Sequence, residues 1–495
     1  MSVKPQYETY RYTGEVAKIR SQSMVECRLS GSEIGSILAT ETSVIPTESV
    51  CGDGEVRYKG KALLCIVYED GDGKICRAER GVEFSHKAEN QAVTPSCFSK
   101  TAFEVVSVSN RREGSGLYVT IIADAIIDVY GGKQMEYLVG GEDVVCQTDT
   151  LTLCKTVCVT GETEGEDEFE TDYVGDIVLH SENAVVTRMR ASGGQLDIEG
   201  EIALVVCALK GDNGVCSYER IVPFTMKIPC EEAFGRVNPC ARVSVRSATL
   251  TAGVDEDKAK SKIVFSYTLS ADCYLSRLEE LTIARDAFSV GFETGLARVR
   301  DTGRYLTSIQ THTQRVGGVA SFSAELDGEY ALETAVSPRA ETTCKRAENG
   351  WEVEGIITAE IFVKNADGGR KTRTLSLPFV FPVEVDGAFV EADCLVCGVN
   401  VRKKNNGETE AEATVKLCLR VYEETAWEYI NEYTVGEEKP VCDAAVSVFM
   451  TREGESLWEV AKRLSTPPDE LQSANPELQF PVTAGQRIFV YRQIK

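Results

Sequence analysis

Cysteine and histidine are the residue types in this chain whose spacing could hold a metal ion or support redox chemistry. The chain has 18 cysteines and three histidines. Cys394 and Cys397 form its only CxxC pair, and no second pair or nearby histidine completes a zinc-ligand set. Because the cysteines are spread through segments with the pattern of strands, we expect them to be reduced and to pack as small hydrophobic residues. The role of Cys394 and Cys397 stays open.

Two acidic segments offer carboxylates that could bind cations. Asp70, Asp72 and Gly73 begin like a calcium-binding loop, but the later glutamate that such a loop requires is absent, and we expect a hairpin turn. The acidic run at 162–172 could bind cations or a basic partner, but the more usual structure of such a run is a solvated loop, which is our prediction. The chain contains no phosphate-binding loop, nucleophile elbow or HExxH pair. We therefore assign no catalytic residue, no metal site and no cofactor, and we predict that the protein is not an enzyme.

The length and charge of the chain bound its organisation and its partners. Its 495 residues allow three or four domains, and 43% hydrophobic content is ordinary for a globular protein. The net charge of −24 disfavours binding to nucleic acid and to anionic lipid. No apolar run approaches the roughly 18 residues that span a bilayer, and the first residues do not form an apolar export signal. We expect a cytoplasmic protein with no membrane span.

Three segments of the chain align when Gly60, Gly200 and Gly355 are placed in register. On both sides of each glycine, every second residue is apolar or aromatic, and the positions between them near the glycine are mostly charged. A period of two with one polar face is typical of a half-buried antiparallel strand. We expect each glycine to mark a bulge or a bend in a long strand. The three aligned segments are residues 56–68, 196–208 and 351–363.

The residues that follow each aligned segment also repeat. Each segment is followed by a turn rich in Gly, Asn and Asp, and an aromatic residue stands 24 positions after each glycine, namely Phe84, Phe224 and Phe379. A second run of alternating strands then closes each unit. The sequence therefore predicts a mainly β fold with three tandem β-sandwich-like modules, at 1–145, 146–290 and 291–440. The strand order within a module stays open.

The last part of the chain, residues 446–495, has a different pattern and is called the tail. It begins with a short apolar strand at 446–450, and Ser456 and Glu459 form a capping box at the start of a helix. A second helix starts at the prolines 467–468, and a closing strand occupies 486–490. The tail holds six basic and six acidic residues, so the net negative charge lies upstream of it. The pattern predicts a small βααβ unit.

The tail resembles a LysM domain. The resemblance rests on Val448, the turn 452–458, Ala461, Leu471, the pair 475–476 and the residues 484–486. The family's usual Gly-Asp-Thr turn is replaced at 454–456, and its closing Ile-Pro is replaced at 490–491. LysM domains bind polymers of N-acetylglucosamine, the glycan of peptidoglycan, through backbone groups of two loops. The resemblance implies a groove for a glycan or a partner between one loop with Gly454, Glu455, Ser456 and Leu457 and another loop with Asn475, Pro476, Glu477 and Leu478.

The order of three β-modules followed by one LysM domain resembles the SPOCS-domain family of spore-coat morphogenetic proteins. That resemblance implies a structural adaptor of spore-coat assembly, located in the mother-cell cytoplasm and recruited to the forespore surface. It also implies docking to a SpoIVA-like coat scaffold ATPase, with the LysM domain as a protein-binding surface and with possible self-association. The alternative is a peptidoglycan-binding protein in which the β-modules act as a spacer. The residues alone leave the partner, the oligomeric or filament state and the choice between glycan and protein open.

Overall fold

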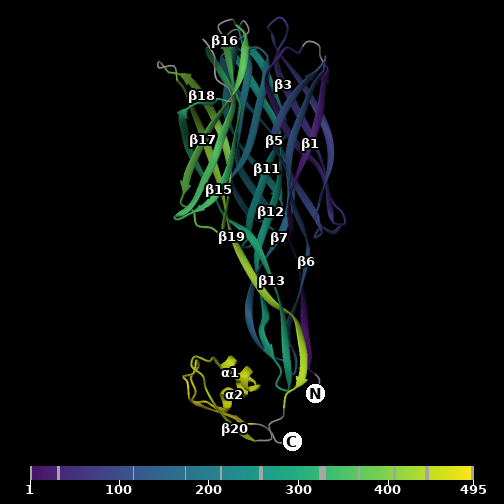
Figure 1. Ribbon diagram of the computed structural model, residues 1–495, viewed down its shortest axis with the longest axis vertical. Helices are drawn as coiled ribbons and strands as arrows, with labels where there is room; N and C mark the ends of the chain where they lie inside the picture. The colour runs from purple at the N-terminus through teal and green to yellow at the C-terminus, as the bar shows by residue number, and fades with distance from the viewer. Residues whose placement is uncertain are drawn as a thin grey trace.

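The computed structural model shows a mainly β protein with several small antiparallel sheets and two short helices (Figure 1). The mainly β fold class predicted from the sequence is confirmed. Most strands run along the long axis of an elongated body, and the tail lies at one end of that body, near the N-terminus. The structure describes residues 3–30, 34–114, 116–172, 174–211, 214–255, 260–322, 330–365, 368–404, 408–440 and 445–491.

The first predicted module forms two three-stranded antiparallel sheets. One sheet has the strand order β1-β6-β5, and the other is the meander β2-β3-β4. The strands are β1 (Lys4–Ser30), β2 (Ser36–Cys51), β3 (Glu55–Glu69), β4 (Ile75–Glu89), β5 (Phe98–Glu113) and β6 (Gly116–Glu142).

The second predicted module has the same strand order in its two sheets. The first sheet is β11-β12-β7, and the meander is β10-β9-β8. The strands are β7 (Val145–Asp172), β8 (Ile177–Ser192), β9 (Gln195–Lys210), β10 (Gly214–Pro229), β11 (Asn238–Asp255) and β12 (Lys260–Phe288).

The third predicted module differs only by a short additional strand at the edge of its meander. Its sheets are β13-β19-β18 and β14-β17-β16-β15. The strands are β13 (Phe292–Val319), β14 (Ser321–Phe322), β15 (Tyr330–Ala347), β16 (Gly350–Asn365), β17 (Arg370–Val383), β18 (Phe389–Lys403) and β19 (Thr409–Glu438).

Each predicted module has its own apolar core between its two sheets. The alternating apolar residues of β3, β9 and β16 supply much of each core, and all of those singled out from the sequence are buried except Tyr68. Because successive side chains of a strand point to opposite faces, the period of two in the sequence places these residues on one face. The hydrophobic pattern therefore sets which face of each meander is inside.

The three glycines used to align the sequence sit opposite the three phenylalanines. Gly60, Gly200 and Gly355 pair across the ladder with Phe84, Phe224 and Phe379. A Cβ atom built on each glycine would lie 2.6, 2.2 and 2.4 Å from the Cζ of the phenylalanine ring. The bulge expected at the glycines lies instead in the neighbouring strands β2 and β8, opposite Gly60 and Gly200, and no register shift occurs at Gly355. The glycines leave space for an aromatic ring that lies across the strand.

This arrangement gives a testable prediction at Gly200. A Cβ atom there would lie 2.2 Å from Phe224 Cζ and 2.3 Å from the backbone oxygen of Val185. Overpacking a core costs typically 1–3 kcal/mol, so Gly200→Ala is expected to lower the free energy of unfolding by about that amount in urea denaturation. Gly132→Ala is the control, because no atom lies within 4 Å of the added Cβ.

A second substitution distinguishes contact of the added Cβ atom with a phenylalanine ring from contact with the backbone. The atoms nearest to a Cβ at Gly60 belong only to the side chains of Phe84 and Phe103. Phe84→Leu should therefore restore much of the stability lost in Gly60→Ala, whereas Phe224→Leu should not restore Gly200→Ala. Equal rescue at both sites would contradict the role assigned to the Val185 carbonyl.

The three predicted modules pack against one another along the body (Figure 1). One apolar cluster joins Leu38, Leu179 and Phe362, and a second joins Leu138, Ala284 and Ile430, so each cluster draws on all three ranges. Tandem modules with only small interfaces between them unfold nearly independently. The shared clusters instead favour cooperative unfolding of the body.

The tail contains β20 (Val446–Met450), α1 (Leu457–Leu464), α2 (Pro468–Ala474) and β21 (Arg487–Tyr491). The two strands pair in antiparallel fashion, and both helices pack against one face of this sheet around a small apolar core.

Candidate functional site

The predicted groove begins at the loop that leads into helix α1. Ser456 caps the helix: its hydroxyl accepts a hydrogen bond from the backbone N–H of Glu459 at 3.2 Å, and its own N–H donates to the Glu459 carboxylate at 2.8 Å. The capping box predicted from the sequence is confirmed. The polar groups of Ser456 are therefore used within the tail.

The neighbouring residues of this loop are also held from inside the tail. Gly454 has a φ of 75°, and its N–H donates to the Val482 carbonyl, while the Val482 N–H donates to the Glu455 carbonyl. The Glu455 carboxylate accepts hydrogen bonds from the Arg463 guanidinium at 2.8 Å and from the Arg452 N–H at 2.8 Å. The hydrogen bond from Arg463 is the main reason that the pKa of Glu455 lies below its ordinary value. This loop is therefore held by hydrogen bonds within the tail, and the Glu455 carboxyl is ionised at neutral pH.

The second side of the predicted groove is organised by Asn475. Its buried side chain donates to the carbonyls of Leu471 at 2.9 Å and Phe489 at 2.7 Å, and its Oδ1 accepts from the Phe489 N–H at 2.7 Å. Asn475 therefore joins the end of α2 to β21 from inside the tail. Of the other residues predicted here, Pro476 and Glu477 are exposed.

One leucine of each predicted loop packs against the core of the tail. Leu457 and Leu478 are both partly buried against the same apolar cluster, which also contains Val460 and Leu471. The polar side chains of Glu455, Ser456 and Asn475, in contrast, are engaged inside the tail, as described above. Pro476 and Glu477 are the exposed members of the second loop.

Helix α1 holds the tail on the end of β12. Asp286 accepts hydrogen bonds from the Trp458 indole Nε1–H at 2.8 Å and from the Lys462 ammonium at 2.7 Å. The Phe288 ring meets the Trp458 ring edge to face, with the centroids 5.3 Å apart, and Phe288 is buried in the apolar core of the tail. Lys439 adds a second link, because its ammonium donates to the Ser289 carbonyl and to the Ser465 hydroxyl. The position of the tail on the body is therefore fixed by specific contacts.

The ionisation of Asp286 makes this docking depend on pH. Burial alone would raise the pKa of Asp286, but the hydrogen bonds from Lys462 and Trp458 outweigh it, and the pKa lies below its ordinary value of about 3.9. A carboxyl group with a lowered pKa contributes stability above its ordinary pKa and loses it as the pH falls through the lowered value. Docking is therefore expected to be intact at neutral pH and to weaken only below about pH 4.

The indole N–H resonance of Trp458 in a ¹⁵N-tryptophan-labelled sample measures this transition. It should shift as the pH falls below about 4, while the resonances of Trp351 and Trp427 report on whether the body remains folded. In Asp286→Asn the resonance should already differ at neutral pH and should lack this titration. A Trp458 signal that titrates equally in both proteins would contradict the role of Asp286.

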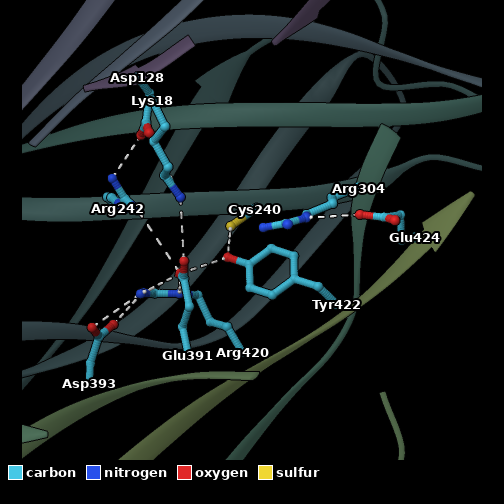
Figure 2. A network of polar contacts seen from close by, with 10 residues as sticks. All are labelled: Lys18, Asp128, Cys240, Arg242, Arg304, Glu391, Asp393, Arg420, Tyr422 and Glu424. Carbon is cyan, nitrogen blue, oxygen red and sulfur yellow. Dashed lines mark hydrogen bonds and ion pairs between the residues drawn. The ribbon is translucent and has the colours of Figure 1, made fainter. Parts of the chain in front are cut away.

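A partly buried network of charges joins the three predicted modules and is called the central network (Figure 2). Arg242 of β11 donates to Asp128 of β6 at 2.8 Å, and its guanidinium also lies 4.0 Å from Glu391 of β18. Arg420 of β19 binds both Glu391, at 3.1 Å, and Asp393. The modules are therefore joined through two guanidinium groups and three carboxylates.

Further groups of the network surround Glu391. The Lys18 ammonium lies 3.6 Å from Glu391, and the Tyr422 hydroxyl donates to Glu391 at 3.2 Å. Burial alone would raise the pKa of Glu391, but the nearby cations Arg420, Arg242 and Lys18 outweigh it and lower the pKa. The three cations and three carboxylates balance one another. This balance is typical of a connection between packed elements.

The other residues considered from the sequence lie in structural positions. Cys394 and Cys397 lie in β18, and burial raises the pKa of both thiols, to about 12 for Cys394, so neither is a reactive thiolate at neutral pH. All the described cysteines are free. Asp70 forms the expected hairpin turn, accepting hydrogen bonds from the N–H groups of Asp72 and Lys74.

The prediction of a loop for the acidic run 162–172 is wrong, because these residues form the second half of β7. The acidic residues Glu162, Glu164, Glu166, Glu168, Glu170 and Asp172 occupy every second position. A strand therefore places all of them on one face. Two of them pair with lysines of β12, Glu170 with Lys260 at 3.1 Å and Glu168 with Lys262 at 2.5 Å. The alternation was visible in the sequence and predicted a strand better than the charge predicted a loop.

Neither a metal site nor a membrane-spanning helix occurs within the described residues. In that part of the chain no group of three or more His, Cys, Asp or Glu residues is arranged to hold a metal ion. None of the described helices is long and apolar enough to cross a membrane. Comparison with known proteins found no matching family model, curated protein or solved structure.

Proposed function

We propose that this protein is a non-enzymatic structural adaptor of spore-coat assembly, similar to the clostridial spore-coat morphogenetic protein SipL. In this proposal the body consists of three SPOCS-like β-modules, and the tail is a LysM domain that docks to a SpoIVA-like coat scaffold ATPase. The observation that carries the proposal is the recurrence of one strand order in three consecutive pairs of sheets, followed by the order β20-α1-α2-β21. The protein acts in the mother-cell cytoplasm and is recruited to the forespore surface.

The construction of the body supports an adaptor role. Shared apolar clusters and the central charge network hold the three predicted modules side by side, and Asp286 holds the tail at one end. The protein thus presents the tail at a fixed place on an elongated body (Figure 1). The acidic residues are concentrated in the body, whereas the tail sequence is neutral. An acidic protein surface is therefore repelled by the body more strongly than by the tail.

The internal hydrogen bonds of the predicted groove favour protein docking over glycan binding. LysM domains hold acetamide groups through backbone groups of the two loops, but the Gly454 N–H and the Glu455 carbonyl are already hydrogen-bonded to Val482. Asn475 is turned into the core of the tail. Fewer groups are thus available for a glycan than the LysM resemblance alone implies.

Binding of two purified ligands tests the proposed function. The full chain and a chain without residues 446–495 are compared for binding to the coat scaffold ATPase of the same bacterium and for sedimentation with purified peptidoglycan. The adaptor role predicts tail-dependent binding to the ATPase and no sedimentation with peptidoglycan. Tail-dependent sedimentation without binding to the ATPase would support the peptidoglycan-binding alternative instead.

A further inference from the structure

The tail exposes an apolar surface on the outer face of its two-stranded sheet. Val446, Val448 and Met450 of β20 are 48%, 54% and 56% exposed. In β21, Phe489 is 38% and Tyr491 is 59% exposed. Val446 pairs with Tyr491 and Val448 with Phe489, so these four side chains lie next to one another on one face. We call these five residues the outer face.

The composition of the outer face is unusual for a sheet exposed to water. The other side of the same sheet carries Ile488 and Val490, which are buried in the core of the tail. An antiparallel sheet with one buried face normally places polar residues on the other. Five of the six paired outer positions are nevertheless apolar, and together they expose on the order of 500 Å². Contiguous apolar patches of this size on a monomer often bind another molecule.

We propose that the outer face docks an amphipathic helix of a partner protein, in line with the proposed adaptor function on which this inference rests. A sheet buries its apolar face against another sheet or a helix, and a helix is the occupant that fits this small face. Five residues of strand span about 17 Å, which is the length of a helix of about 11 residues. Two strands with their side chains present a width of about 10 Å, close to the diameter of one helix.

A second copy of the chain is a poorer occupant for the outer face. A stable specific interface buries about 800 Å² on each partner, more than the roughly 500 Å² that this face exposes. A single helix with apolar residues at positions i, i+3, i+4 and i+7 covers the face and leaves its polar side in water. The exposed area of the outer face is therefore better matched by one short helix than by a second copy of the chain.

Charge further defines the helix. Arg487 occupies the sixth outer position, opposite Met450, and its guanidinium forms no hydrogen bond or ion pair within the described part of the chain. A carboxylate on the partner helix at the Met450 end would meet this guanidinium. The outer face is open to such a helix, because the tail is held on β12 by Trp458 and Lys462 of α1, on the other side of its core. The inferred occupant is an amphipathic helix with an acidic residue at one end.

Substitutions on the outer face and in the predicted groove separate the two surfaces. Val448→Lys and Phe489→Lys each add one positive charge to the outer face, and Glu477→Gln makes the same charge change in the groove. The probes are a displayed library of 12-residue amphipathic helices and the purified coat scaffold ATPase. Each probe is measured against the full chain and the three variants, and circular dichroism and amide exchange of the tail verify folding.

Selected helices are expected to bind the full chain, with affinity at least tenfold weaker for both outer-face variants and unchanged for Glu477→Gln. The ATPase should show the same order of effects. A library that yields no helix dependent on the outer face would overturn the inference. ATPase binding that survives both outer-face changes and is lost in Glu477→Gln would also overturn it, while leaving the adaptor function in place. Loss of ATPase binding to every form, with helices still held by the outer face, would contradict the adaptor function and support the inference.

Discussion

Arg420→Met is expected to lower the free energy of unfolding of the body by about 1.5–3 kcal/mol, because it removes the charged hydrogen bonds to Glu391 and Asp393. Glu391 keeps its contacts with Lys18, Arg242 and the Tyr422 hydroxyl. Arg420 is 9% exposed, and its guanidinium contacts both Glu391 and Asp393. Methionine fills much of the space of the arginine stem without supplying a charge. The loss is measured by urea denaturation at neutral pH, followed by circular dichroism.

A cation at the surface of the same sheet provides the control for Arg420. Arg402 of β18 pairs with Glu410 at 2.8 Å, but its side chain is 75% exposed. Exposed ion pairs contribute about 0–1 kcal/mol, so Arg402→Met should change stability by less than 1 kcal/mol. Adding Asp393→Asn to Arg420→Met should recover part of the loss, because no other cation pairs with Asp393 in the described part of the chain. Similar effects at Arg402 and Arg420 would contradict the importance of burial.

The central network also predicts how unfolding spreads through the body. Its residues come from β1, β6, β11, β18 and β19, which belong to all three predicted modules. A loss at Arg420 is therefore expected to destabilise all three together. Hydrogen exchange that shows loosening only after residue 290 would support independent modules instead.

Much of the fold could be predicted from the sequence because apolar residues with a period of two record which side of a strand is buried. The pattern around Gly200 predicted β9, and the 24 residues to Phe224 follow from the β9–β10 hairpin, in which these two residues face each other. The role of the glycine could not be predicted, because a close approach between two strands depends on register. The glutamates of β7 show the opposite outcome. They alternate with a period of two, which is typical of a strand, but their acidic composition led to the prediction of a loop.

The central network could not be predicted because its members are brought together only by packing between modules. Asp128 lies in an apolar strand segment, and Arg420 lies in the equally apolar segment 415–421. A charged residue in such a segment indicates a buried partner of opposite charge. The partner of Asp128 is Arg242, more than 100 residues away in sequence, and the partner of Arg420 is Glu391, nearly 30 residues away. In the tail, by contrast, both loops of the predicted groove lie within about 25 residues of each other in sequence. The orientation of Asn475 into the core was not visible, because a helix stop and a ligand-binding amide share the same residue type.

Asn475→Ala is expected to unfold the tail while leaving the body folded. The substitution removes three hydrogen bonds and leaves the Phe489 N–H and the carbonyls of Leu471 and Phe489 without these partners. A loss of about 3 kcal/mol follows from roughly 1 kcal/mol for each hydrogen bond. A unit of about 50 residues seldom has more than 3–5 kcal/mol of stability, so this loss removes most of it. Hydrogen exchange should show loss of protection at Val460 and Leu471 and unchanged protection in β6 and β12.

Two variants of the same loop accompany this prediction. Asn475→Asp keeps the acceptor for the Phe489 N–H but turns a buried carboxylate oxygen toward the carbonyls of Leu471 and Phe489, so the loss of protection should be at least as large as in Asn475→Ala. Glu477→Gln changes an exposed residue two positions later and should leave protection unchanged. Because Asn475→Ala would abolish binding of any ligand through unfolding, only exposed positions such as Glu477 can test the predicted groove. Full protection of the tail in Asn475→Ala, together with lost binding, would instead return Asn475 to the ligand-binding surface.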